Sequence, residues 1–186
     1  MAAEPSSPHP VTAIVVMGVS GAGKTTIGKA LARRLDMDFI DADDLHTPAN
    51  VARMAAGLPL TDADRAPWLA RVGAAIDDAR RDGRQLVIAC SALRRCYRQA
   101  IGGGAPDVRM VWLTGAPELI RRRMGARQGH FMTATMLDSQ LATLEPPAPG
   151  ENIPGVDVDA APADIVDRIL AALFPGMRAG AVAGPY

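Results

Sequence analysis

The chain has 186 residues, of which 48% are hydrophobic and 4% aromatic. Its 20 Lys and Arg residues balance 20 Asp and Glu residues, so charge gives no reason to expect binding to nucleic acid or to an anionic membrane. No stretch approaches the ~20 apolar residues of a transmembrane helix, and the first ten residues do not resemble a signal peptide. We therefore expect a single-domain cytoplasmic protein whose two cysteines are reduced.

Short apolar runs alternate with stretches of helical periodicity along the chain. Ile27, Leu31 and Leu35 recur every four residues, as on one face of a helix. Thr61 and Asp64 resemble a capping box that opens a longer helix. The expected strands are residues 13–17, 38–40, 86–90, 108–113 and 156–158. The expected helices are residues 27–35, 47–56, 61–81, 92–101, 117–124, 133–144 and 162–173.

This alternation predicts an α/β fold, namely a five-stranded parallel sheet with helices on both faces. Residues 11–174 form the expected single domain, between a disordered leader over 1–10 and a flexible tail over 175–186. Ligands in such sheets bind at the carboxyl ends of the strands. The loops after residues 17, 40, 90 and 113 are therefore expected to surround one crevice.

The stretch MGVSGAGKTT, residues 17–26, matches the P-loop pattern G-x-x-x-x-G-K-[ST] between a strand and a helix. Its glycines let backbone N–H groups surround a phosphate, and the helix N-terminus adds partial positive charge. Lys24 can reach the β- and γ-phosphates, and Thr25 can offer a hydroxyl to Mg²⁺. The motif alone fits a switch GTPase, a motor ATPase or a small-molecule kinase. The predicted nucleotide contacts in the loop are Gly18, Val19, Ser20, Gly21, Ala22, Gly23, Lys24, Thr25 and Thr26.

Two carboxylates after the second strand favour a kinase. Asp41 and Asp43 would share one face of an extended segment. One could hold Mg²⁺ through water, and the other could accept the proton of an attacking hydroxyl. We assign Asp41, with Thr25, to the metal and Asp43 to catalysis.

The stretch LIRRRMGARQGHFM, residues 119–132, predicts a mobile lid over about residues 124–134. Arg123 and Arg127 lie one helical turn apart, and a lid that carries them would exclude water and stabilise the transferring phosphoryl group. Arg123 could instead stack on adenine, beside residues 159–163. The guanine-reading pattern Asn-Lys-x-Asp is absent from the sequence, which disfavours a GTPase.

Several segments, in order, resemble the gluconokinase family. They are VMGVSGAGKTTIGKALARRL, FIDADDLHTPANVARMAAGLPLTDADRAPWL, VIACSALRRCYR, VWLTGAPELIRRRM, RQGHFM and SQLATLEPP. The resemblance covers about residues 13 to 147, whereas shikimate kinases share only the broader architecture. It implies transfer of the γ-phosphoryl group of ATP to the C6 hydroxyl of D-gluconate, a nucleoside-kinase-like fold with a lid, and a homodimer.

A small polyol acid calls for arginine at its carboxylate and for carboxylates or amides at its hydroxyls. Arg94 and Arg98 are spaced i, i+4, and we expect at least one of them to reach an anion. His46 could contact the substrate or cap the turn at Thr47. The predicted catalytic residues are Lys24, Asp43 and Arg127. The predicted substrate contacts are Asp43, His46, Arg53, Ser91, Arg94, Arg98, His130 and Gln140.

Two alternatives remain at this point. The protein could phosphorylate shikimate or another small hydroxy acid, or it could be a regulator that hydrolyses ATP without any acceptor. Trp68 is expected in the core or at an interface rather than stacked on a ligand.

Overall fold

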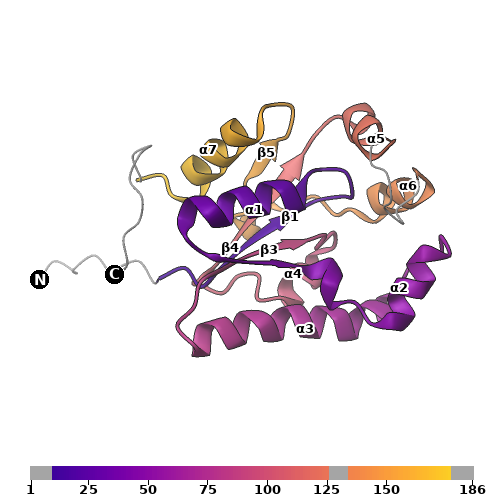
Figure 1. Ribbon diagram of the computed structural model, residues 1–186, viewed down its shortest axis with the longest axis horizontal. Helices are drawn as coiled ribbons and strands as arrows, with labels where there is room; N and C mark the ends of the chain where they lie inside the picture. Colours follow the sequence, from indigo (N-terminus) through magenta and orange to yellow (C-terminus); the bar gives the residue numbers. More distant parts are fainter. Residues whose placement is uncertain (1–9, 126–133, 177–186) are drawn as a thin grey trace, which may run out of the picture.

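The computed structural model describes residues 10–125 and 134–176, and its five strands form one parallel sheet in the order β2-β3-β1-β4-β5 (Figure 1). Most of the expected leader, tail and lid lies outside the described residues, and so do Arg127 and His130. Each strand matches its predicted range to within one residue at either end, so the predicted sheet is confirmed. The strands are β1 (Ala13–Met17), β2 (Asp38–Asp41), β3 (Leu86–Cys90), β4 (Val108–Thr114) and β5 (Gly155–Asp157).

The described ranges also contain seven α-helices and two 3-10 turns. No helix in these ranges is both long and apolar enough to cross a bilayer. The α-helices are α1 (Lys24–Leu35), α2 (Pro48–Ala55), α3 (Asp62–Arg81), α4 (Arg95–Ala100), α5 (Pro117–Gly125), α6 (Ala134–Thr143) and α7 (Pro162–Leu173). The 3-10 turns are η1 (Ala42–Leu45) and η2 (Pro149–Glu151).

Helices cover both faces of the sheet, as predicted, with α1 and α7 on one face and α3 and α4 on the other (Figure 1). The side chains of β1 divide between these layers. Ile14 and Val16 join the core beneath α1 and α7, whereas Val15 and Met17 join the core beneath α3. All five residues of β1 are buried, which is typical of a parallel strand covered on both faces.

The starts of two helices show how local sequence sets the element boundaries. The Thr61 hydroxyl accepts from the backbone of Asp64, whose carboxylate accepts from the backbone of Thr61, so the predicted capping box of α3 is confirmed. By contrast, α4 starts three residues later than expected. Ala92 takes a left-handed φ of 42°, which cannot continue into an α-helix.

A buried ion pair joins α4 to η2. Arg98 has 1% of its surface exposed, and its Nε and Nη2 atoms donate to the Glu151 carboxylate over 2.7 and 2.8 Å. Its Nη1 atom donates to the carbonyl of Glu145 over 3.0 Å. The two bonds from Arg98 to the Glu151 carboxylate lower the pKa of Glu151 to about 2. Arg98, predicted to contact the substrate, thus lies in the interior as a structural cation.

Replacing Glu151 by Gln should destabilise the protein by about 3 kcal/mol, because it leaves the Arg98 charge buried without its counter-ion. Urea denaturation at pH 7 measures the loss. The matched control is Glu118→Gln, whose side chain is 80% exposed and 4.0 Å from Arg121, and it should cost less than about 0.5 kcal/mol.

The pH dependence of this effect has a definite sign. Because folding lowers the pKa of Glu151 from 4.5 to about 2, its contribution to stability is fully present above pH 4.5 and is lost as the pH falls through about 2. The gap between wild type and Glu151→Gln should therefore narrow on acidification. A gap that stays constant would contradict this assignment.

Candidate active site

The chain between β1 and α1 wraps around the first of two adjoining pockets, the P-loop pocket. Gly23 takes a left-handed φ of 93° directly before α1 begins at Lys24, a conformation that favours glycine. The Lys24 ammonium donates to the Val19 carbonyl over 3.1 Å, which holds the lysine against the loop. The pocket has a volume of about 360 Å³ and is lined by Ser20, Gly21, Gly23, Lys24, Thr25, Asp41, Asp43, Asp44, His46 and Val51.

Thr25 and Asp41, the predicted metal residues, meet at one edge of this pocket. The Thr25 hydroxyl donates to Oδ2 of Asp41 over 2.7 Å. A hydroxyl and a carboxylate are hard oxygen ligands of the kind that Mg²⁺ prefers, directly or through water. The two residues therefore fit a magnesium ion shared with the phosphates of a nucleotide.

Asp43 reaches the site by a different route from the one predicted. The chain after Asp41 is not extended, so the prediction of an extended segment is wrong. The Asp41 carboxylate accepts from the backbone N–H of Asp43 over 3.1 Å, and this cap starts the 3-10 turn η1. The turn brings Asp41 and Asp43 to the same pocket, and it leaves Asp43 on the border of a second one.

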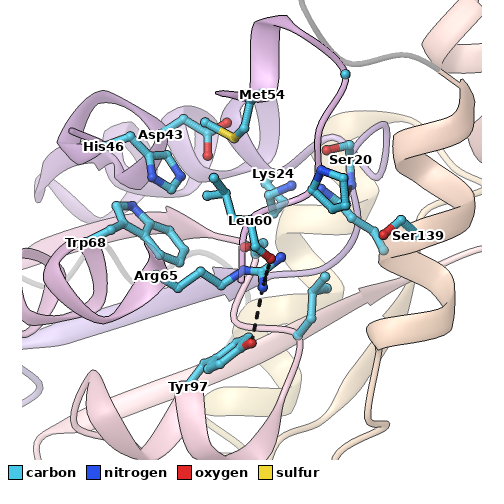
Figure 2. A pocket seen from close by; sticks show the side chains of 15 residues that line it. Ser20, Lys24, Asp43, His46, Met54, Leu60, Arg65, Trp68, Tyr97 and Ser139 are labelled. Carbon is cyan, nitrogen blue, oxygen red and sulfur yellow. Dashed lines mark hydrogen bonds between the residues drawn. The ribbon is translucent and has the colours of Figure 1, made fainter. Parts of the chain in front are cut away.

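This second cavity, the Trp68 pocket, has a volume of about 170 Å³. It shares Ser20, Lys24, Asp43 and His46 with the P-loop pocket. In Figure 2, Ser20 and the α6 residue Ser139 lie across the pocket from His46 and Trp68. The remaining lining residues are Met54, Gly57, Pro59, Leu60, Arg65, Trp68, Ser91, Leu93, Tyr97, Ser139 and Gln140.

His46 and Trp68 form one wall of the Trp68 pocket. Their rings stack with centroids 4.4 Å apart and an interplanar angle of 13°, and the Trp68 indole N–H donates to the Ala42 carbonyl over 2.6 Å. Trp68 is 2% exposed, as expected of a core residue. Burial lowers the pKa of His46 against the opposing effect of Asp43. This favours the neutral imidazole, which can donate one hydrogen bond and accept another. The Thr47 hydroxyl itself caps α2.

Arg65 also lines the Trp68 pocket, and sequence reasoning gave it no role. Its side chain is 20% exposed, and Nη1 donates to the Leu60 carbonyl over 2.6 Å and to the Tyr97 hydroxyl over 3.4 Å (Figure 2). The capping box at Thr61 places Arg65 in the first turn of α3. The capping box predicts that Arg65 lies at the start of a helix, but it does not predict which side of that helix lines a pocket.

Arg65 lies 3.8 Å from the Asp62 carboxylate, and the three arginines that were predicted to contact the substrate are also paired with protein carboxylates. Arg53 lies 3.6 Å from Asp64 with its side chain 43% exposed, and Nε of Arg94 donates to Glu145 over 3.1 Å. With Arg98 bound to Glu151, none of these three arginines lines the P-loop or the Trp68 pocket. The predicted substrate residues that the structure brings together around the Trp68 pocket are Asp43, His46, Ser91 and Gln140.

A third pocket lies on the other side of the P-loop, where adenine was expected. Arg123 borders it and donates to the carbonyl of Val158 over 2.8 Å. The pocket measures about 240 Å³, and its walls are largely apolar, as a nucleobase requires. It is lined by Gly21, Ala22, Gly23, Thr26, Ile27, Arg123, Ala160, Pro162 and Ile165.

The chain is similar to known proteins over most of its length. A family model described as an AAA domain matches residues 14–147. The gluconokinase of Gluconobacter oxydans (strain 621H) is 43% identical over 157 residues, which cover 84% of this chain and 88% of that protein. A probable gluconokinase of Xenopus tropicalis is 42% identical over 171 residues, with coverage of 84% and 90%. The crystal structure of a gluconokinase from Sinorhizobium meliloti 1021 matches with a TM-score of 0.79 and 42% identity over 90% of this chain and 93% of that one. With this similarity over most of its length and a P-loop beside an acidic turn, the chain belongs to the gluconokinase family.

Proposed function

We propose that the protein transfers the γ-phosphoryl group of ATP to the C6 hydroxyl of D-gluconate, giving ADP and 6-phospho-D-gluconate. The observation that carries this proposal is the continuity of two pockets, which share Ser20, Lys24, Asp43 and His46. A phosphoryl group held by the P-loop would therefore face a chamber for a small acceptor. Membership of the gluconokinase family supports gluconate as that acceptor.

The nucleotide would lie across the P-loop, with adenine in the pocket beside Arg123 and the phosphates in the P-loop pocket. The loop N–H groups and Lys24 would bind and orient the phosphates. Thr25 and Asp41 would hold Mg²⁺, which when bound neutralises charge on the phosphate oxygens. Arg127 stays a predicted contact to the transferring group.

Asp43 would orient the acceptor hydroxyl. In the transfer, the C6 oxygen forms a bond to the γ-phosphorus, and the bond from that phosphorus to the β,γ-bridging oxygen breaks. ADP leaves with the bridging oxygen, and the hydroxyl proton passes to the Asp43 carboxylate. Since the transition state of phosphoryl transfer is loose, positioning by Asp43 contributes more than removal of the proton.

The position of Arg65 suggests how gluconate would be oriented in the Trp68 pocket. The cations Lys24 and Arg65 both line the Trp68 pocket. Lys24 also lines the P-loop pocket, whereas Arg65 does not. We place the gluconate carboxylate at Arg65, and this leaves the far hydroxyl at the shared border beside Asp43. His46 and Ser91 also line this pocket and offer hydrogen bonds to the other hydroxyls.

The competing functions predict different substrate responses. A regulator without an acceptor would release ADP at a rate that gluconate does not change, and a kinase for another acid would respond to that acid instead. A coupled assay of ADP release with gluconate, shikimate, glycerate and glucose separates these cases. Stimulation by gluconate alone is expected. The family resemblance also leads us to propose a cytoplasmic homodimer, which light scattering and cell fractionation would test.

Substituting Lys24 by Ala should lower kcat/KM by about 10³-fold, because the ammonium that balances the phosphate charge is lost. The coupled ADP assay measures this. Lys29→Ala is the matched control, because Lys29 is an exposed residue of the same helix, and it should retain wild-type turnover. Similar rates for the two variants would refute the role of Lys24.

Substituting Asp43 by Asn should lower kcat by about 10²-fold and leave ATP affinity unchanged, because the carboxylate acts on the acceptor. Steady-state rates and calorimetric titration with ATP measure the two quantities. Asp167→Asn, on the exposed face of α7, is the control. An unchanged kcat in Asp43→Asn would show that the carboxylate takes no part in transfer.

Substituting Arg65 by Met should raise KM for gluconate by about 10- to 100-fold, the loss expected when a charged hydrogen bond to a carboxylate disappears. The neutral polyol D-glucitol separates charge from packing. The weak binding of D-glucitol should not change in Arg65→Met. The control is Arg81→Met, at an exposed position of α3, which should change the binding of neither gluconate nor D-glucitol. Equal losses for gluconate and glucitol would argue against a carboxylate contact.

A further inference from the structure

The tip of the P-loop is held between two helices. On one side, the backbone N–H of Ser20 donates to Oε1 of Gln140 over 2.7 Å. On the other side, Gly21 packs so tightly on α5 that an added Cβ would lie 2.6 Å from Cγ of Met124 and 3.0 Å from the Ile120 carbonyl. Gln140 belongs to α6, so consecutive residues of the loop contact different helices.

The position of α6 is itself fixed by the segment after β3. The backbone N–H of Glu145, two residues beyond α6, donates to the Leu93 carbonyl over 2.8 Å. The Glu145 carboxylate accepts from Nε of Arg94 over 3.1 Å and from the backbone N–H of Arg95 over 2.8 Å. Contacts through Glu145 therefore link Gln140 to residues 93–95, which follow β3.

Ser20, which Gln140 contacts, lies at the border between the two pockets. It lines both the P-loop pocket and the Trp68 pocket, so a shift of its backbone changes the phosphate site at its border with the acceptor. A side-chain acceptor that fixes one N–H group restricts the loop before any ligand arrives, which lowers the conformational cost of binding.

Gln140 lines the Trp68 pocket, but its Oε1 atom is bonded to the P-loop. We propose that Gln140 is a positioning residue that acts on the nucleotide through Ser20. It couples α6, and through Glu145 the residues behind the acceptor pocket, to the shape of the phosphate loop. This inference rests on the proposed function for the identity of the ligands. The bond between Gln140 and Ser20 does not depend on it.

The test is Gln140→Met, which keeps the length of the side chain and a good helix former but removes the acceptor. Affinity for the non-hydrolysable analogue AMPPNP, titrated without gluconate, should fall about three- to tenfold, the equivalent of one neutral hydrogen bond. KM for ATP should rise by the same factor. Affinity for gluconate, titrated without nucleotide, should fall by a smaller factor than affinity for AMPPNP.

The matched control is Gln99→Met, an exposed glutamine of α4, which should change neither affinity. Thermal unfolding of each variant shows whether the fold is kept. Unchanged AMPPNP affinity in Gln140→Met, or a loss confined to gluconate, would overturn the proposal. Neither result would bear on gluconate-stimulated ADP release by the wild type, so the two proposals fail separately.

A second variant tests the path through α6. Glu145→Ala removes the carboxylate that ties this helix to Arg94 and Arg95, and it should also weaken AMPPNP binding. If its effect passes through Gln140, the double variant should bind AMPPNP as Gln140→Met does. Losses that add fully in the double variant would overturn the path from Glu145 to the loop.

Discussion

Because all five strands run parallel, β1, β2 and β3 end at one edge of the sheet, and short connections bring the polar groups of the site together there. The strand β1 leads into the P-loop, β2 into Asp41 and Asp43, and β3 into Ser91. The central strands are buried on both faces, so the core holds these loop origins in place. Rigid supports of this kind give a site the positional accuracy that phosphoryl transfer needs.

Several polar groups at this edge serve both the fold and the proposed chemistry. The Asp41 carboxylate caps η1 with one oxygen and receives the Thr25 hydroxyl with the other. The Trp68 indole fixes the same turn through the Ala42 carbonyl. Asp41 and Ala42, the two residues before Asp43, are both bonded, so Asp43 is held at the border of the two pockets by its neighbours.

The sheet and the P-loop could be predicted because their signals are local. Buried parallel strands appear as short apolar runs, and the glycines of the loop are required by the backbone itself. The surroundings of individual side chains are set by residues far away in the sequence. The spacing of Arg94 and Arg98 suggested an anion as their partner, and both bind protein carboxylates. The partner of Arg98 is Glu151, 53 residues further on, which spacing along one helix cannot reveal.

The remaining differences have the same origin. Strand alternation could bring Asp41 and Asp43 to one side, but it could not foresee that an Asp cap would end the strand at Asp41. Arg65 follows a recognisable capping box. Its place in the Trp68 pocket, however, depends on its hydrogen bonds to Leu60 and Tyr97, which also line that pocket. Arg127 and His130 stay predictions, since they lie outside the described residues.

The stacked pair of His46 and Trp68 has a practical consequence. The indole lies in the wall of the Trp68 pocket and donates to the turn that carries Asp43. The chain's other tryptophan, Trp112, lies on β4 and does not line that pocket. Indole emission responds to the polarity and the ring neighbours of its surroundings. The protein thus contains a native fluorophore at the place where the sugar acid would enter, and ligand occupancy can be followed by light without attaching a label.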